Sequence, residues 1–158
     1  MEYSESLYID FAQRTRKNLD FIRESKRKQP SIDIYEVTQL INSLLGLLVF
    51  PQQQYYRQIP ETPLEVLANQ GWPIPTVIGD FPQVTDLRQL LRYLRNAVTH
   101  SNMKFLSDNE HQINGIQVWN QAQGEVVWRA ELTISDLEII TGKFIELIIR
   151  RSTQSRLF

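Results

Sequence analysis

The stretch "RYLRNAVTHSN", residues 92–102, holds the side chains whose types and spacing best suit chemistry. Arg95 is followed five positions later by His100, which is one of only two histidines. A guanidinium presents a planar fork of hydrogen-bond donors that matches a phosphate group. An imidazole ordinarily titrates close to neutral pH, so it can take up or release a proton during a reaction. The pair therefore meets the minimum chemical need for cleaving RNA without a metal ion.

A helical wheel places this pair outside the apolar face of its helix. Residues 83–100 have helical periodicity, and an apolar stripe runs along one side. At about 100° per residue, Arg95 falls about 80° to one side of the stripe and His100 about 140° to the other. Asn96 is expected to point directly away from the core. The polar half of the helix carries the following side chains: Arg92, Arg95, Asn96, Thr99 and His100.

The separation between the two groups favours a site shared by two chains. Arg95 and His100 lie about 7.5 Å apart along the helix axis and about 140° apart around it. One histidine cannot easily remove a proton from the attacking oxygen and also donate one to the leaving oxygen. Two copies that face each other across a symmetric dimer supply both groups. Spacing alone is weak, and the alternative interpretation is an ordinary surface pair.

Composition excludes several classes of site. The chain has 158 residues, a net charge of −1 and no cysteine, which rules out disulfides and thiolate zinc sites. No global basic field exists, so any anion-binding surface must be local. His111 follows Asp108 and Glu110, but three ligands in one flexible loop are a poor metal signal, and a solvated loop histidine is the simpler interpretation. We expect neither a metal nor another cofactor.

No apolar run long enough for a signal peptide or a membrane span is evident. The first twenty residues are charged and aromatic. The longest apolar segment, residues 44–50, falls far short of the roughly 20 residues that a spanning helix needs. We therefore expect a cytoplasmic protein without membrane contact.

The remaining periodicity predicts mainly helical structure in one domain over residues 1–158. A capping box of Asp33 and Glu36 is expected to begin the second helix, and one of Ser135 and Glu138 the last. Helices are predicted over four ranges: 4–27, 33–50, 83–100 and 135–151.

Two segments interrupt these helices. Residues 51–82 hold six of the seven prolines, and are interpreted as a proline-rich excursion that packs over the helices and contains one short helix stopped by Gly71. Residues 112–132 alternate in polarity around "QAQG", which predicts a small β-hairpin. The fold class expected is a bundle of about four helices with these two additions.

The quoted motif resembles the signature of the HEPN superfamily, the higher eukaryote and prokaryote nucleotide-binding helical domains. That signature is an arginine, often followed by a polar residue, and then a histidine four to six residues later near a helix end. Arg95, Asn96 and His100 match it. The flanking "NSLLGLLVFPQQ" and "INGIQVWN" resemble one branch in particular, the pEK499 p136 type. The resemblance spans most of the chain.

The resemblance implies a helical bundle that dimerises with two such motifs facing one cleft. Many members are metal-independent endoribonucleases in toxin–antitoxin, phage-defence or CRISPR-linked systems, so RNA, a second copy and an antitoxin protein are the implied partners. By this resemblance, Arg95 is expected to hold the scissile phosphate, His100 to act as the acid and base, and Asn96 to support them. Arg92 and Thr99 share the polar surface and are expected to contact nucleic acid.

The same resemblance leaves a second function open. Some HEPN domains lack nuclease activity and serve as nucleotide-binding or protein-interaction modules, or as structural subunits. The hairpin and the proline-rich excursion depart from the plain four-helix pattern, which leaves the shape of the cleft undetermined.

Overall fold

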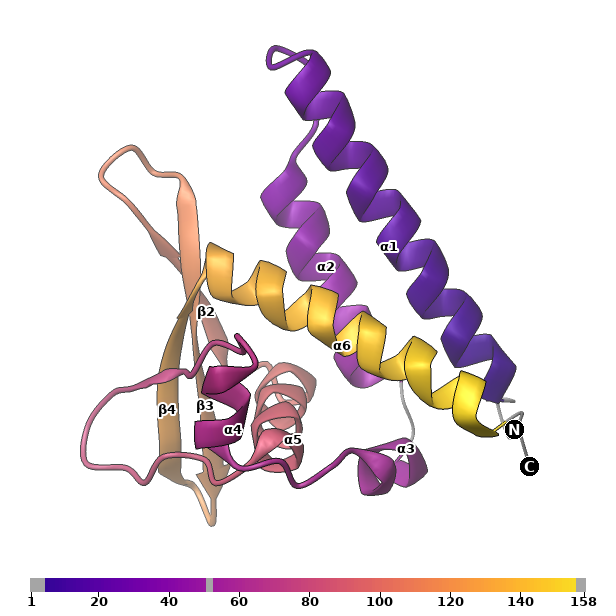
Figure 1. Cartoon of the computed structure of the whole chain (residues 1–158). Coiled ribbons are helices and arrows are strands. Elements are labelled where there is room, and N and C mark those ends of the chain that lie inside the picture. Colours follow the sequence, from indigo (N-terminus) through magenta and orange to yellow (C-terminus); the bar gives the residue numbers. More distant parts are fainter. Residues whose placement is uncertain (1–4, 51–52, 156–158) are drawn as a thin grey trace.

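The computed structural model describes residues 5–50 and 53–155. These residues form helices and one antiparallel sheet with the strand order β1-β4-β3-β2 (Figure 1). The helices are α1 (Glu5–Lys28), α2 (Glu36–Val49), α3 (Gln53–Gln58), α4 (Leu64–Asn69), α5 (Leu87–Thr99) and α6 (Ile134–Ser155). The strands are β1 (Thr76–Val77), β2 (Met103–Ser107), β3 (Ile113–Ala122) and β4 (Glu125–Thr133).

The fold is mixed α/β, which corrects the expectation of a mainly helical bundle with a small hairpin. The predicted hairpin is present as β3 and β4, and the helical content is 54%. Two further strands extend the hairpin into a four-stranded sheet. β1 is only two residues long and comes from the proline-rich segment, so it has no alternation that a sequence pattern can reveal.

The helices form one layer and the sheet another, with α5 between them. Figure 1 shows α1 and α2 side by side, with α6 crossing them, and the sheet standing beside this group. α5 contacts α2 on one side and β3 on the other. The helix that carries the motif is therefore fixed from two directions by elements distant in sequence.

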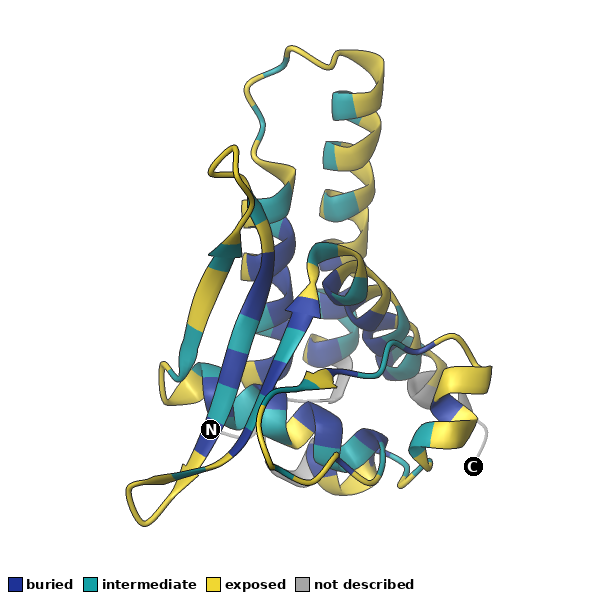
Figure 2. Cartoon of the chain, turned by 90° about the vertical axis from the view of Figure 1, so that its left-hand side faces the viewer, coloured by how far each residue is buried: buried dark blue, intermediate teal, exposed yellow. Residues whose placement is uncertain are grey.

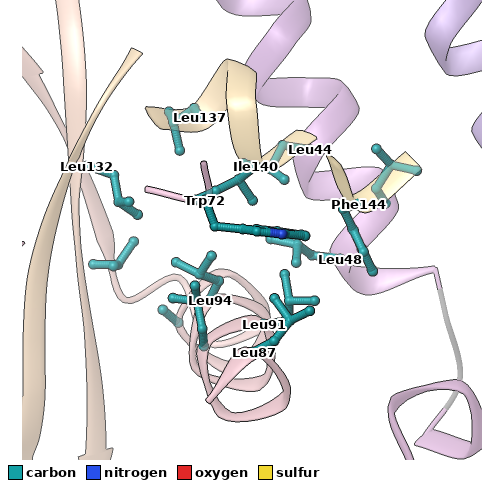
Figure 3. Close-up of a cluster of buried hydrophobic side chains, with 14 of the residues drawn as sticks. Leu44, Leu48, Trp72, Leu87, Leu91, Leu94, Leu132, Leu137, Ile140 and Phe144 are labelled. Carbon is teal, nitrogen blue, oxygen red and sulfur yellow. The ribbon is translucent and has the colours of Figure 1, made fainter. Parts of the chain in front are cut away.

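The core lies where α2, α5, α6 and the inner face of the sheet meet. Figure 3 shows Trp72 in the middle of this cluster, surrounded by side chains from the three helices and β4. The labelled members are Leu44, Leu48, Trp72, Leu87, Leu91, Leu94, Leu132, Leu137, Ile140 and Phe144. All of them are buried, and each such side chain removed from water stabilises the fold by roughly 1.5–3 kcal/mol.

The excursion packs on the helices, as predicted. α4 forms where a short helix was expected and is followed by Gly71 at φ +73°, a conformation that favours glycine. Leu67 of α4 and Trp72 are both buried in the core. Figure 2 shows the contrast with the far end of α1, which projects from the body and is largely exposed.

Strand register assigns side chains to the two faces of the sheet. Asn120 pairs with Trp128 on the inner face, and Trp119 pairs with Arg129 on the other. Trp128 contacts Tyr93 of α5 edge to face, with ring centroids 5.1 Å apart. Trp119 and Trp128 therefore lie on opposite faces of the sheet and do not pair with each other.

Both predicted capping boxes were misplaced. Tyr35, not Asp33, occupies the N-cap of α2, and it forms no side-chain cap. At the start of α6, Thr133 and Asp136 satisfy each other's backbone N–H groups with their side chains, at 2.8 and 3.1 Å. This is the reciprocal capping geometry, shifted two residues toward the N-terminus from the expected Ser135.

Candidate functional site

The C-terminal end of α5 has a defined geometry that sets the direction of the motif. His100 is the C-cap, and the next residue, Ser101, has φ +57°. The Ser101 N–H donates to the Val98 carbonyl at 3.0 Å, and the Asn102 N–H donates to the Ala97 carbonyl at 2.7 Å. These two bonds form a Schellman motif, which stops the helix sharply and places His100 at its exposed end.

Arg95 lies on the side of α5 that faces α3. Its Cζ atom is 5.0 Å from the centroid of the Tyr56 ring, and the side chain is half-buried. The Tyr56 hydroxyl donates to the Leu48 carbonyl at 2.7 Å, which anchors the ring to α2. Within the described part of the chain, the Arg95 guanidinium makes no ion pair or hydrogen bond. Its donors therefore remain available to an anion.

His100 lies on the opposite side of α5, beside the sheet. It lines a pocket of about 350 Å³ between the end of α5 and β3. The other lining residues all carry carboxamides, and we call this feature the carboxamide pocket. They are Asn96, Asn102, Asn120 and Gln121.

The structure brings Asn96 and His100 together and leaves Arg95 apart. Asn96 was expected to point directly away from the core, but it is half-buried because β3 covers that side of α5. Arg95 does not line the carboxamide pocket, so this pocket unites only two of the three motif side chains. This arrangement agrees with the wide separation that the helical wheel gives.

The side chains of Arg92 and Thr99 are exposed. The Thr99 hydroxyl donates to the Arg95 carbonyl at 2.8 Å, which ties it to its own helix. Arg92 extends the same polar surface. Both side chains remain accessible to a nucleic acid.

Charge on α5 is locally positive although the chain is nearly neutral. Residues 87–99 include Arg88, Arg92 and Arg95 and no acidic residue. Arg88 is paired with Glu61, so Arg92 and Arg95 carry the uncompensated charge of this helix within the described residues. An anionic ligand is therefore attracted to this surface and not to the molecule as a whole.

Sequence reasoning missed four residues around the motif. Tyr56 supports Arg95, and Asn102, Asn120 and Gln121 complete the pocket. Asn102 lies two residues after His100 and ends the quoted stretch, so its position was a usable signal. The strand residues reach the motif only through the packing of β3 on α5, which no local pattern reports.

The second histidine belongs to a different region. His111 is exposed and lines a pocket of about 450 Å³ with the segment that joins α1 to α2. No group of three or more histidine, aspartate or glutamate side chains suited to a metal ion occurs in residues that the structure describes. His111 therefore takes no part in the α5 site.

Comparison with protein-family models identifies the family of the chain. Residues 1–155 match the family model described as HEPN pEK499 p136. No curated protein and no solved structure matches the chain. None of the described helices combines the length and apolarity that crossing a membrane requires. Because the family match extends over nearly the whole sequence, the chain belongs to the pEK499 p136 family of HEPN proteins.

Proposed function

We propose that the protein is a metal-independent endoribonuclease whose active site forms between two copies of α5. The observation that carries this proposal is the end of α5 itself. Arg95 presents a guanidinium that no residue in the described ranges pairs with, and His100 lies at the exposed helix end beside Asn96. Membership of the HEPN family supports the same function.

The reaction requires two proton transfers and stabilisation of charge. One His100 takes the proton of the ribose 2′-hydroxyl, and the oxygen attacks the adjacent phosphorus. The 5′-oxygen leaves and receives a proton from His100 of the partner subunit, which leaves a cyclic phosphate and a 5′-hydroxyl. The guanidinium of Arg95 stabilises the charge that develops on the phosphate oxygens, and Asn96 supports the site.

The placement of the side chains supports a shared site. Arg95 and His100 occupy different sides of α5, and no metal-binding cluster is needed for the steps above. A second protomer related by a two-fold axis supplies the groups that one chain lacks.

Cleavage by matched variants tests this proposal. Arg95→Ala and His100→Asn are expected to lower the cleavage rate at least about 100-fold, the contribution of positioned acid–base and charge-stabilising groups. Arg150→Ala and His111→Asn are the controls, since both are exposed and lie outside α5. EDTA is expected to leave the rate unchanged. Equal cleavage by all five proteins, or none by wild type across varied RNAs, contradicts the proposal.

A mixing experiment tests the shared site. Wild type and His100→Asn are mixed in equal amounts and allowed to exchange subunits. If each site needs His100 from both copies, only the wild-type homodimers are active, and about one quarter of the activity of the same total amount of wild type remains. If each copy acts independently, about one half remains. The measurement is the initial cleavage rate after exchange, with the oligomeric state followed by light scattering.

The cellular role that fits this activity is toxicity in a toxin–antitoxin or phage-defence system. Such a ribonuclease requires a neutralising partner, for which an antitoxin protein is proposed. Expression of wild type is expected to arrest growth, and His100→Asn is expected to relieve the arrest at equal protein level. Equal toxicity of the two proteins contradicts this role.

A non-catalytic nucleotide-binding or protein-interaction module is the second candidate. The observation that favours it is the absence of Arg95 from the pocket that contains His100. This candidate predicts binding of RNA without turnover and binding that tolerates His100→Asn. The cleavage assay above separates the two functions.

A further inference from the structure

Arg88 and Arg95 lie on the same side of α5 and contact the same neighbouring segment. They are seven positions apart in the sequence. In an α-helix this spacing is about 10.5 Å along the axis and only about 20° around it. Arg95 lies over the ring of Tyr56 in α3, and Arg88 contacts residues 59–61, which directly follow α3. Two guanidinium groups of α5 therefore meet one short part of the proline-rich excursion.

The guanidinium of Arg88 is bound to that part of the excursion by two contacts of unequal weight. Its Nε atom donates to the Ile59 carbonyl at 2.7 Å, and its Nη1 atom forms an ion pair with Glu61. The Glu61 side chain is 66% exposed, and exposed ion pairs contribute little to stability. Ile59 is fully buried, so its carbonyl is removed from water and a charged donor is worth more there. The contact with Ile59 is therefore the one that fixes the excursion to α5.

Ile59 is connected in turn to Tyr56. The Ile59 N–H donates to the Tyr56 carbonyl at 3.3 Å, which extends α3 by one further turn. The Tyr56 hydroxyl donates to the Leu48 carbonyl of α2 at 2.7 Å. The position of the ring beneath Arg95 therefore depends on two connections, one from its hydroxyl to α2 and one from its backbone through Ile59 to Arg88.

We propose that Arg88 is a positioning residue for Arg95. Through Ile59 and α3 it holds the Tyr56 ring beneath the Arg95 guanidinium, and the ring restricts the directions in which that guanidinium points. The donors of Arg88 are directed at Ile59 and Glu61, so Arg88 supports the site without binding the phosphate. That the positioned guanidinium serves cleavage rests on the proposed function, whereas the connection between Arg88 and Arg95 does not.

The NMR signal of the Arg95 Nε–H group in the whole protein tests this connection, because a ring beneath a guanidinium shifts the signals of its protons. Tyr56→Leu gives the position of the signal without a ring. Arg88→Ala is expected to move the Arg95 signal part of the way toward that position. Glu61→Gln retains the bond to Ile59 and is expected to leave the signal in place. An unmoved signal in Arg88→Ala, or an equal movement in Glu61→Gln, overturns the proposal.

A control variant separates positioning from a general loss of stability. Arg88→Ala leaves the buried Ile59 carbonyl without its charged donor, so it is expected to lower the denaturation midpoint. Ile116→Val removes a buried methylene group from β3 and is expected to lower the midpoint as well, while leaving the Arg95 signal in place. If Ile116→Val moves the Arg95 signal as far as Arg88→Ala does, the movement reports a loosened fold and the proposal is overturned.

A double-mutant cycle tests the same connection in cleavage. Arg88→Ala is expected to lower kcat/KM roughly two- to fivefold, which is the worth of the contact between the ring and the Arg95 guanidinium. In a Tyr56→Leu background the same substitution is expected to lower kcat/KM no further, because the ring through which Arg88 acts is already absent. Losses that multiply in the double variant overturn the proposal.

The two proposals fail in different ways. If wild type cleaves no RNA and Arg88→Ala still moves the Arg95 signal, the nuclease proposal is lost and the positioning role stands. If wild type cleaves RNA while Arg88→Ala changes neither the Arg95 signal nor kcat/KM, the nuclease proposal stands and the positioning role is lost.

Discussion

The ring of Tyr56 lies beneath the guanidinium of Arg95, whose Cζ atom is 5.0 Å from the ring centroid. An attraction of this kind contributes about 0.5–1 kcal/mol at exposed sites. It restricts the conformations of Arg95, and no described residue accepts a hydrogen bond from its N–H donors. The side chain is therefore partly organised for an anion before one binds.

Two substitutions at Tyr56 separate the ring from its hydroxyl. Tyr56→Phe keeps the ring and loses the bond to the Leu48 carbonyl, so we expect a loss of about 1 kcal/mol in the free energy of unfolding and unchanged cleavage. Tyr56→Leu removes the ring beneath Arg95, so we expect its kcat/KM for cleavage to fall several-fold below that of Tyr56→Phe. Denaturant unfolding and initial rates provide the measurements. Equal rates for the two variants argue against a positioning role for the ring.

At the scale of elements, Asp86 determines where α5 begins. Its side chain accepts from the Gln89 N–H at 2.9 Å and from the Thr85 hydroxyl at 2.6 Å. Partial burial raises the pKa of Asp86, but the hydrogen bonds from Thr85, Gln89 and Arg88, with the charge of Arg88, lower it more. The pKa therefore lies below its ordinary value of 3.8.

Substitution of Asp86 tests this cap. Asp86→Ala is expected to lower the free energy of unfolding by about 1 kcal/mol near neutral pH, and Asp86→Asn by less, because asparagine retains the acceptor. A carboxylate with a lowered folded-state pKa stabilises the protein above its unfolded-state pKa, and this contribution disappears as the pH falls through the folded-state pKa. The gap between wild type and Asp86→Asn should therefore close only below the ordinary pKa of 3.8. A gap independent of pH contradicts the prediction.

Alanine substitutions at two glycines, one in a helix and one in the sheet, are expected to change the stability of the protein in opposite directions. At the exposed Gly142 of α6, an added Cβ meets nothing within 4 Å, so Gly142→Ala is expected to stabilise by about 0.5–1 kcal/mol. At Gly115 of β3, an added Cβ lies 2.5 Å from the Leu132 carbonyl oxygen, so Gly115→Ala is expected to lower the free energy of unfolding by about 1–3 kcal/mol. Thermal and denaturant unfolding measure both. A change in the free energy of unfolding that has the same sign in both variants contradicts this explanation.

At the scale of the molecule, the proline-rich excursion belongs to the core. Trp72 lies within the cluster of side chains contributed by α2, α5, α6 and β4 (Figure 3). β1, from the same excursion, adds a strand to the edge of the sheet beside β4. The segment therefore joins the helical layer to the sheet, although its composition resembles that of a loop.

Removal of the Trp72 side chain tests this structural role. Trp72→Ala is expected to lower the free energy of unfolding by about 3–5 kcal/mol, the cost of a large cavity in a core. Val66→Ala in the same excursion is the control, because Val66 is 42% exposed and its loss should cost less than about 0.5 kcal/mol. Chemical denaturation of both variants measures the difference. A small effect at Trp72 contradicts the assignment of the excursion to the core.

Much of the helical structure and the motif could be predicted from the sequence. The periodicity of residues 87–99 locates α5, and the same wheel places Arg95 and His100 outside its buried stripe. These features depend on neighbours three or four positions apart, so local sequence contains them. Capping residues were less predictable, because Asp33 and Ser135 have the right types but lie in the wrong positions.

By itself, the sequence determined which residues share the polar side of α5 and that Arg95 and His100 diverge from each other. Only the tertiary structure decided what each of them meets. Tyr56 reaches Arg95 because α3 packs on α5, and Asn120 reaches the neighbourhood of His100 because β3 packs on the opposite side. The pocket also lies beside a β-bulge in β4, where Val127 has no partner in the register with β3. Such contacts join residues distant in sequence, and their energies depend on packing that no short segment specifies.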